Sequence, residues 1–334
     1  MSICKARMRV RLDRRSVLKA ALAAGAILAC SPVWAQAQYP NQSIRFLVPY
    51  APGGLPDTVA RITAQHLQTR VGQNVVVENR PGGGAAAAAS ALMSAPADGY
   101  TFIVTDGALA STNHLLIKQI TYNPKDMVPV ALLGRAPLFL AAHPDLPVST
   151  LREFVEYVKA RPGQVNYGSS GVGSVHHLSM EALKAPLGLV MTHIPYRGTG
   201  QSVPALLGGH VPVLFSAYPS LVGAVESKKV KLLAANGPKA SPQAPDVPPI
   251  AEIIPGYDLA TIVGIYARPG IPQAIMEKLA AEAIAGINTA EARRQFAASG
   301  IEFDNGGPDA FAKALNREIE NVAKVVKSAG IQAQ

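Results

Sequence analysis

The chain has 334 residues, of which 49% are hydrophobic, and carries 31 Lys and Arg against 22 Asp and Glu, for a formal net charge of +9. Seven of the basic residues and one acidic residue lie within the first 19 positions, so the remainder has 24 basic and 21 acidic side chains, a net charge of +3. This near balance, without a basic stripe interleaved with aromatic residues, argues against a nucleic-acid partner.

Residues 1–37 have the pattern of an export signal. Basic side chains surround a run that resembles a twin-arginine signal, Asp13–Lys19, and a short apolar stretch follows at Ala20–Ala29. Ala35-Gln36-Ala37 fits a small-x-small cleavage site, so we expect cleavage near Ala37 and export to the periplasm. The mature chain would then have no disulfide and no cysteine ligand or nucleophile, because the removed segment holds both cysteines, Cys4 and Cys30.

Strands and helices alternate through the remainder of the chain. Short apolar runs bounded by turn residues predict strands at 44–49, 74–78, 100–105, 138–142, 165–167, 191–194, 211–215, 230–234 and 262–266. Amphipathic spacing predicts a helix capped by Ser149 and further helices at 57–70, 85–94, 174–184, 203–207, 220–226, 272–287 and 308–328. This alternation predicts an α/β fold with largely parallel sheets.

The mature length is ample for two domains, and we expect two lobes with a ligand cleft between them. Lobe 1 is predicted to comprise residues 39–137 plus 250–334, and lobe 2 to comprise residues 138–249. Ligands of open α/β sheets bind outside the carboxyl ends of the strands, where loops lead into helices. The glycine-rich turns of this chain are predicted to lie at such ends.

The turn after the first predicted strand is the most informative part of the sequence. It runs from Tyr50 through Gly53 and Gly54 to Asp57, between a buried strand and an amphipathic helix. A glycine turn at a helix N-terminus leaves backbone N–H groups pointing outward, where an anion can accept them. Tyr50 is a candidate wall of the cleft. Asp57 has two interpretations, an acid favoured by the helix dipole or a group that accepts a ligand amine or hydroxyl.

The second glycine turn, within Tyr167–Ser174, is the strongest local signal. Its glycines let the backbone approach a ligand closely, and its serines offer neutral hydroxyl donors to a carboxylate or phosphate. A plain turn with Ser174 as the helix cap is the alternative interpretation. The candidate ligand-binding residues here are Ser169, Ser170, Gly171, Gly173, Ser174 and His176.

Other chemistries fit these residues less well. The loop lacks the G-x-G-x-x-G spacing of dinucleotide sites. Reading G-x-S-x-G from Gly168 puts Ser170 in the middle, but Val172 stands at the final glycine position. His177 and Glu181 are spaced to share a metal on one helix face, yet neither an H-E-x-x-H motif nor a third ligand is evident. We therefore expect neither a cofactor nor a metal.

A third loop follows the strand predicted at 191–194. Tyr196 and Arg197 lie directly after this strand, and Arg197 is either a charged partner for a carboxylate or a surface arginine. Thr199 is expected to cap the next helix. Tyr196, Arg197 and Thr199 are candidate ligand-binding residues.

Several segments together resemble one known family. They are YPNQSIRFLVPYAPGGLPDTVAR, VVVENRPGGG, DLPVSTLREFVEYVKARPGQVNYGSSGVGSVHHLSMEAL, HIPYRGTGQSVPALLGGHV and FDNGGPDAF. With the export signal, they resemble the solute receptors of tripartite tricarboxylate transporters, the Bug-type periplasmic binding proteins, over essentially the whole mature chain. The resemblance implies a two-lobed, type II periplasmic-binding-protein-like fold that closes on a small carboxylate.

The resemblance also implies where the ligand lies. One carboxylate is expected to be held, mostly through backbone N–H groups, by Tyr50–Asp57 and Ser169–Ser174. The strand end at Thr105–Ala108, with Thr105 as its candidate residue, and the loop at Tyr196–Thr199 are expected to contribute further contacts. The chain departs from the usual family pattern at three places that bear on the distal half of this site, Ile262-Val263-Gly264, Gln201-Ser202 and Asp106-Gly107.

We therefore expect a monomeric periplasmic receptor rather than an enzyme. It would capture a small organic (di)carboxylate between its lobes and deliver it to the membrane permease subunits of a tripartite tricarboxylate transporter. The alternative is an exported hydrolase or isomerase acting on a small carboxylate or ester, built around Ser170, His177 and Asp57.

Overall fold

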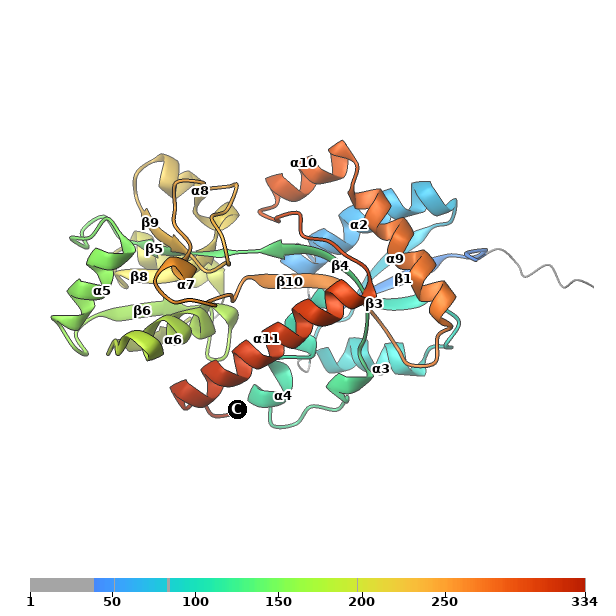
Figure 1. Cartoon of the computed structure of the whole chain (residues 1–334), viewed down its shortest axis with the longest axis horizontal. Coiled ribbons are helices and arrows are strands. Elements are labelled where there is room, and N and C mark those ends of the chain that lie inside the picture. Colours follow the sequence, from blue (N-terminus) through green and yellow to red (C-terminus); the bar gives the residue numbers. More distant parts are fainter. Residues whose placement is uncertain (1–38, 51, 83–84, 197, 334) are drawn as a thin grey trace, which may run out of the picture. The chain divides into compact units, whose positions relative to one another are not determined.

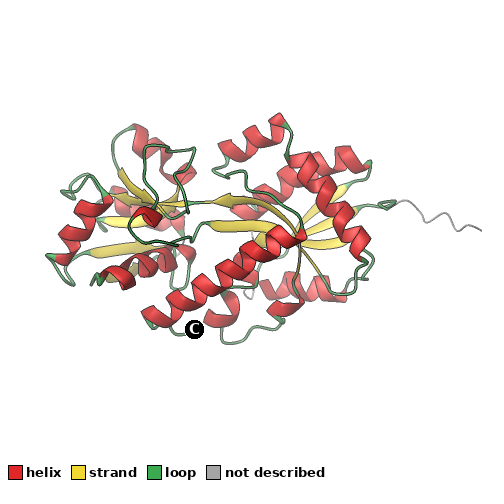
Figure 2. Cartoon of the chain, viewed as in Figure 1, coloured by secondary structure: helices red, strands yellow, loops and turns green. Residues whose placement is uncertain are grey.

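Two five-stranded sheets, each covered by helices on both faces, form the framework of the chain (Figures 1 and 2). The computed structural model describes residues 39–50, 52–82, 85–196 and 198–333. The predicted export signal at 1–37 lies outside the described residues. Across those described ranges, no helix combines the length and the apolar content needed to cross a membrane.

The first sheet has the strand order β2-β1-β3-β10-β4. Strand β1 runs parallel to β2 and β3, whereas β10 runs antiparallel to both β3 and β4. The strands are β1 Ile44–Val48, β2 Val75–Asn79, β3 Thr101–Asp106, β4 Val128–Ala136 and β10 Thr261–Ala267.

Alternate side chains of the central strands pack in two separate cores. On β1, Phe46 and Val48 join a core with α2, α9 and α10, and Leu47 joins the core formed with α3 and α11 on the other face. This period of two follows from the pleat of a strand, in which successive side chains point to opposite faces. The helices are α2 Leu55–Val71, α3 Ala86–Ser94, α9 Gln273–Ile287, α10 Ala290–Ala298 and α11 Pro308–Ala329.

The second sheet repeats this arrangement with the order β7-β6-β8-β5-β9. Strand β6 runs parallel to β7 and β8, whereas β5 runs antiparallel to β8 and β9. Its strands are β5 Leu138–Ala142, β6 Asn166–Ser169, β7 Thr192–Pro195, β8 Val213–Ala217 and β9 Lys231–Ala235. The helices that cover it are α5 Leu151–Lys159, α6 Val175–Leu187, α7 Thr199–Leu207 and α8 Tyr218–Glu226.

The chain crosses between the sheets where β4 leads into β5 and where β9 returns to β10. Asn236 is fully buried and ties these crossings together. Its side chain accepts a hydrogen bond from Leu138 N at 2.6 Å and donates one to the Leu259 carbonyl at 3.0 Å. Each crossing is thereby hydrogen-bonded to the other.

Helix α11 packs on both lobes. Phe311 and Leu315 in its first half pack in a core of the first sheet. Val322 and Val325 in its second half pack in a core of the second sheet. Figure 1 shows this helix running diagonally from one lobe to the other.

The predicted α/β fold with two lobes of the type II arrangement is confirmed. The sheets are mixed rather than largely parallel, because β5 and β10 each enter a sheet from the other lobe and run against their neighbours. The sequence reading also missed β4 and α10. Pro129 interrupts the strand pattern of β4, but β4 lies at the edge of its sheet, where a missing N–H donor is tolerated.

Two predicted helix caps were wrong by one residue. Thr150, not Ser149, caps α5, and its hydroxyl accepts a hydrogen bond from Glu153 N at 3.1 Å. Gly198, not Thr199, is the N-cap of α7, and Thr199 is the first helical residue. The predicted boundaries between the lobes stay a prediction.

Candidate functional site

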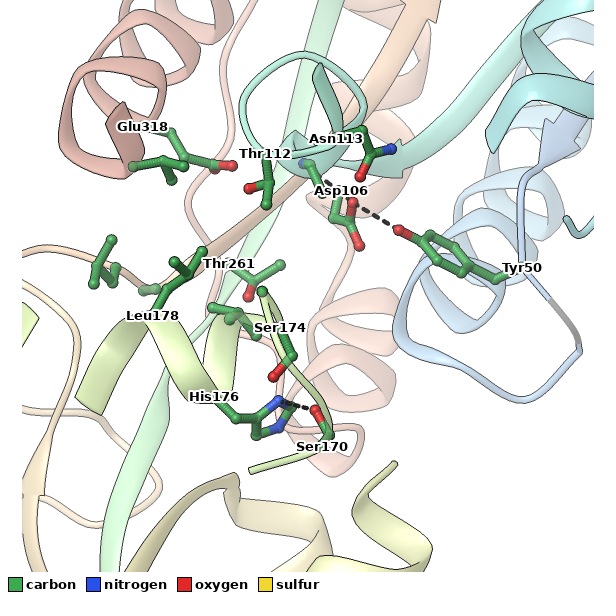
Figure 3. Close-up of a pocket in the computed structure, with 16 residues that line it drawn as sticks. Tyr50, Asp106, Thr112, Asn113, Ser170, Ser174, His176, Leu178, Thr261 and Glu318 are labelled. Carbon is green, nitrogen blue, oxygen red and sulfur yellow. Dashed lines mark hydrogen bonds between the residues drawn. The ribbon is translucent and has the colours of Figure 1, made fainter. Parts of the chain in front are cut away.

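A cavity of about 410 Å³ lies where loops of the two lobes meet (Figure 3). The turns after β1 and β3 line it from the first lobe, the turn from β6 into α6 lines it from the second, and α11 passes along one side. The lining residues are Tyr50, Asp106, Ala108, Thr112, Asn113, Ser170, Gly173, Ser174, Val175, His176, Leu178, Leu259, Ala260, Thr261, Glu318 and Val322. The cavity thus lies outside the carboxyl ends of strands, where ligands of open α/β sheets bind.

The turn from β6 into α6 forms the second-lobe wall. Gly171 and Gly173 have φ of +132° and +77°, a region that favours glycine, and a Cβ on Gly173 would lie 2.7 Å from Cδ1 of Leu116. Ser174 caps the helix as predicted, because its Oγ accepts a hydrogen bond from His177 N at 3.3 Å and donates one to Gly171 O at 2.7 Å. The N-terminus of the 13-residue α6, with its partial positive charge, therefore borders the cavity.

Ser170 and His176 form a hydrogen-bonded pair in this wall. Their Oγ and Nδ1 atoms are 2.6 Å apart (Figure 3). Burial lowers the pKa of His176 to about 4, so the imidazole is neutral at neutral pH. The pair adds hydrogen-bonding groups to the cavity without adding charge.

A layer of stacked rings supports the turn from behind. The ring centroids of His177 and His193 are 4.0 Å apart, and those of His193 and Tyr167 are 4.9 Å apart. His177 Nδ1 accepts a hydrogen bond from Gly173 N at 3.1 Å, and Ser169 Oγ lies 2.6 Å from His193 Nε2. Ser169 is therefore turned toward this layer, and it is fully buried.

The first-lobe wall carries a hydrogen-bonded acid at the end of β3. Asp106 Oδ1 accepts hydrogen bonds from the Tyr50 hydroxyl and from Ala108 N, each at 3.2 Å. Burial raises the pKa of Asp106 to about 6, so its carboxylate is mostly ionised at neutral pH. Burial of the hydroxyl and the adjacent Asp106 charge raise the pKa of Tyr50 well above its usual value, which keeps Tyr50 a donor.

Glu318 supplies a second acid from α11. Its Oε1 accepts a hydrogen bond from Ser111 Oγ at 2.7 Å, and its buried Oε2 has no hydrogen-bond partner among the described residues. Burial raises the pKa of Glu318 to about 8, and the charge of Asp106 acts in the same direction. The cavity wall therefore contains two carboxyl groups from distant parts of the sequence.

The first glycine turn is held together by Asp57. This residue is 2% exposed, and its carboxylate accepts hydrogen bonds from Gly53 N at 2.9 Å, Arg61 Nε at 2.9 Å and Asn79 Nδ2 at 2.8 Å. Burial acts to raise the pKa of Asp57, but these hydrogen bonds outweigh it and lower the pKa. These contacts tie the Asp57 carboxylate into the turn itself, and both interpretations of its role stay predictions.

The structure brings five of the predicted ligand-binding residues to the cavity wall: Tyr50, Ser170, Gly173, Ser174 and His176. Arg197 lies outside the described residues. The other predicted residues are near the two glycine turns or in neighbouring elements but do not line the cavity; they are Gly53, Gly54, Asp57, Thr105, Ser169, Gly171, Tyr196 and Thr199. Their roles toward a ligand stay predictions.

Sequence reasoning did not select Asp106 or Glu318. Asp106 had a signal, because it follows the third predicted strand within the segment Thr105–Ala108 and departs from the usual family pattern there. No sequence signal pointed to Glu318, because it is one of several charged residues on a predicted amphipathic helix. Only the packing of α11 across both lobes brings it to the cavity.

The three residues of the predicted hydrolase site are not assembled. Ser170 pairs with His176 rather than with His177. His177 contacts Gly173 and the stacked rings, and Asp57 is bonded within the first glycine turn. The described residues therefore provide no nucleophile, base and orienting acid in the predicted combination.

Comparison with known proteins identifies a family. The family model described as "Tripartite tricarboxylate transporter family receptor" matches residues 59–331. The chain is similar to the protein BugT of Bordetella pertussis strain Tohama I, with 32% identity over 87% of this chain and 90% of that protein.

Solved structures of similar sequence share the fold. The chain resembles the R. palustris protein Rpa4515 with adipate, with a TM-score of 0.75, 32% identity, and coverage of 89% of this chain and 100% of that one. It also resembles MatC from Rhodopseudomonas palustris with bound malate, with a TM-score of 0.70, 30% identity, and coverage of 86% of this chain and 100% of that one. These two relatives bind small dicarboxylates.

Proposed function

The chain belongs to the receptor family of the tripartite tricarboxylate transporters, and on this premise we propose that it captures a small organic carboxylate between its lobes. The observation that carries the proposal is the Ser170–Ser174 turn, which borders a cavity lined from both lobes. We propose that one carboxylate of the ligand lies against this turn and the N-terminus of α6.

The groups at this wall suit an anion held without a salt bridge. The helix N-terminus offers N–H groups and a partial positive charge, and the hydroxyl of Ser170 lies beside it. Ser174 holds the turn together instead, because it already donates its proton to the Gly171 carbonyl. Hydrogen bonds to a charged ligand strengthen when water is excluded, so closure of the two lobes around the ligand would favour binding. The cavity of about 410 Å³ is within the usual range for a small-molecule site.

We place lobe 1 at residues 39–137 plus 250–334 and lobe 2 at residues 138–249, with closure about the crossings near Leu138 and Leu259. The receptor would work in the periplasm as a monomer without catalysis. It would deliver its ligand to the membrane permease subunits of a tripartite transporter, as the description of its family supports.

The proposal is tested by isothermal titration calorimetry of the exported protein against mono-, di- and tricarboxylates and aromatic acids. We expect saturable binding of at least one acid, with thermal stabilisation that follows RT ln(1 + [L]/Kd). In parallel, the same protein is incubated with the corresponding esters, and product formation is followed.

Two results would overturn the proposal. One is the absence of binding heat for every acid, and the other is turnover of an ester that depends on Ser170. A matched pair of variants tests the position of the site. Ser170 lies in the cavity wall, so Ser170→Ala is expected to weaken binding. Ser149 precedes α5 and does not line the cavity, so Ser149→Ala is expected to leave the affinity unchanged.

A further inference from the structure

We propose that Leu115 and Leu116 form an apolar latch between the lobes, which stabilises the closed state without touching the ligand. This inference rests on the proposed function. It assigns to these two leucines a share of the affinity for whatever carboxylate the cavity binds, although neither of them lines the cavity.

Both leucines belong to α4, a short helix at Asn113–Leu116. This helix lies between β3 and β4 in the sequence, and both strands are part of the first sheet. Asn113 Nδ2 donates a hydrogen bond to the Tyr122 hydroxyl at 3.1 Å, and that hydroxyl donates one to Leu109 O at 2.9 Å. Leu109 and Tyr122 pack in the core that the first sheet forms with α3 and α11. The start of α4 is therefore fixed to the first lobe.

The side chains at the end of α4 contact the second lobe instead. Leu115 packs against a core of the second sheet, the one that contains Tyr167 of β6 and Leu178 of α6. Leu116 is only 9% exposed, although it lies outside the hydrophobic cores that the described residues form on the two sheets. Its Cδ1 would lie 2.7 Å from a Cβ on Gly173, in the turn from β6 into α6. The end of α4 thus bridges the two lobes.

This contact borders the ligand cavity without being part of its lining. Thr112 and Asn113 line the cavity on the side of α4, and Gly173 and Ser174 line it on the side of the turn. Figure 3 shows Thr112 and Asn113 across the cavity from Ser174. The lobes cannot separate at this cavity without parting Leu116 from Gly173, and the leucine side chain would then be exposed to water.

Burial of the two leucines consequently favours the closed state over the open one. The removal of apolar surface from water is favourable in proportion to the area that is buried. A ligand that requires the closed state binds with an apparent affinity that falls with the fraction of molecules in that state. The latch would therefore raise the affinity for every ligand by the same factor, because it joins the lobes and does not contact the ligand.

The test measures, by calorimetry, the affinity of each acid that the natural chain binds. Leu115→Ala and Leu116→Ala should each weaken every acid about tenfold, because buried apolar groups are removed from the closed state only. In stopped-flow measurements, the change should appear mainly as faster dissociation. Leu116→Met keeps an apolar side chain of similar volume and should bind as the natural chain does.

Leu187→Ala is the matched control for Leu115→Ala. Leu187 is half-buried and packs against the same core as Leu115, but it belongs to α6 of the second lobe. Its truncation should lower unfolding stability in urea titrations, as Leu115→Ala does, and leave every affinity unchanged. The comparison separates the loss of the latch from a general loss of stability.

A double variant tests the contact between the lobes directly. In Gly173→Ala the added methyl group meets Leu116, and a second change, Leu116→Ala, makes room for it. Leu116→Ala should therefore weaken binding in the natural chain but cause no further loss in Gly173→Ala. Equal losses in both backgrounds would show that the two residues act independently, and this result would overturn the latch.

The other outcomes separate this inference from the function on which it rests. If acids bind but both leucine variants keep the natural affinity, or if the variants change the preference among the acids, the latch is overturned and the carboxylate receptor stands. If no acid binds to the natural chain, the proposed function fails and the latch fails with it. Circular dichroism of each variant excludes unfolding as the cause of a lost affinity.

Discussion

The carboxylate of Glu318 lies where a side chain on Gly107 would project, although 211 positions separate the two residues in the sequence. Residue 107 begins the short turn after β3, and Glu318 lies in the middle of α11. The absence of a side chain at position 107 therefore allows an acid from the C-terminal helix to reach the cavity wall next to Asp106.

Gly107→Ala is expected to displace the Glu318 carboxylate, because the added methyl group and the carboxylate cannot share one position. The hydrogen bond from Ser111 would be lost, and unfolding stability should fall by about 1 kcal/mol in urea titrations. Gly223→Ala in α8, where nothing lies within 4 Å of the added Cβ, should instead stabilise the protein by up to about 1 kcal/mol. Unchanged stability in Gly107→Ala would contradict the placement of Glu318.

Gly173→Ala tests the turn at α6 against a control with the same backbone conformation. Gly173 and Gly163 have φ of +77° and +76°, so alanine at either position should cost about 1–2 kcal/mol of backbone strain. Only at position 173 does the methyl group also meet a neighbour, Leu116 of the first lobe. Calorimetry should show at least a tenfold loss of affinity for Gly173→Ala and none for Gly163→Ala. A bulky residue at position 171 or 173 should abolish binding, and survival of affinity there would remove the turn from the site.

His177→Ala separates support of the turn from contact with the ligand. His177 is 6% exposed, stacks on His193 and accepts a hydrogen bond from Gly173 N, but it does not line the cavity. Loss of these buried contacts should lower unfolding stability by roughly 1–3 kcal/mol, while affinity should stay within a factor of ten. A much larger loss of affinity, with the fold intact by circular dichroism, would reopen a direct role for this histidine.

The ionisation of the buried Glu318 should be visible in the pH dependence of unfolding stability. Its pKa is about 8 in the folded chain against 4.5 for the free side chain, so between these values the folded state binds more protons than the unfolded state. Stability should therefore fall as the pH rises through this window. Below about pH 6.5 the histidines have the opposite effect, so that stability rises with pH. Burial lowers the pKa of His176 and His193 to about 4, and the unfolded state therefore binds more protons than the folded state in this range.

The informative window is consequently pH 6.5 to 8, above the folded pKa of Asp106, which is about 6. Urea unfolding of the ligand-free protein should show decreasing stability across it, and Glu318→Gln should flatten the profile. Glu320→Gln should retain the slope of the natural chain. A flat profile for the natural chain would show that Glu318 is already ionised in the empty cavity.

Local sequence determined the units that carry the site. The apolar run Ile44–Val48 and the Pro-Gly turn after it specify a buried strand that leads into a helix. Ser174, placed after two glycines and before an apolar helix face, specifies the cap of α6. These signals depend on residues a few positions apart, so they can be read from the chain without knowledge of the fold.

The tertiary structure alone decided which of these units meet at the cavity and which side chains from other elements lie opposite them. Asp106 and Glu318 become neighbours only because α11 packs on the cores of both lobes, and the spacing of an amphipathic helix does not reveal which partner its charged residues will face. The same holds for the direction of β5 and β10, which depends on the lobe from which each strand enters. The hydrophobic periodicity of a sequence predicts which face of a helix or strand is buried. It does not predict which residues pack against that face, because those neighbours come from segments far apart in the chain.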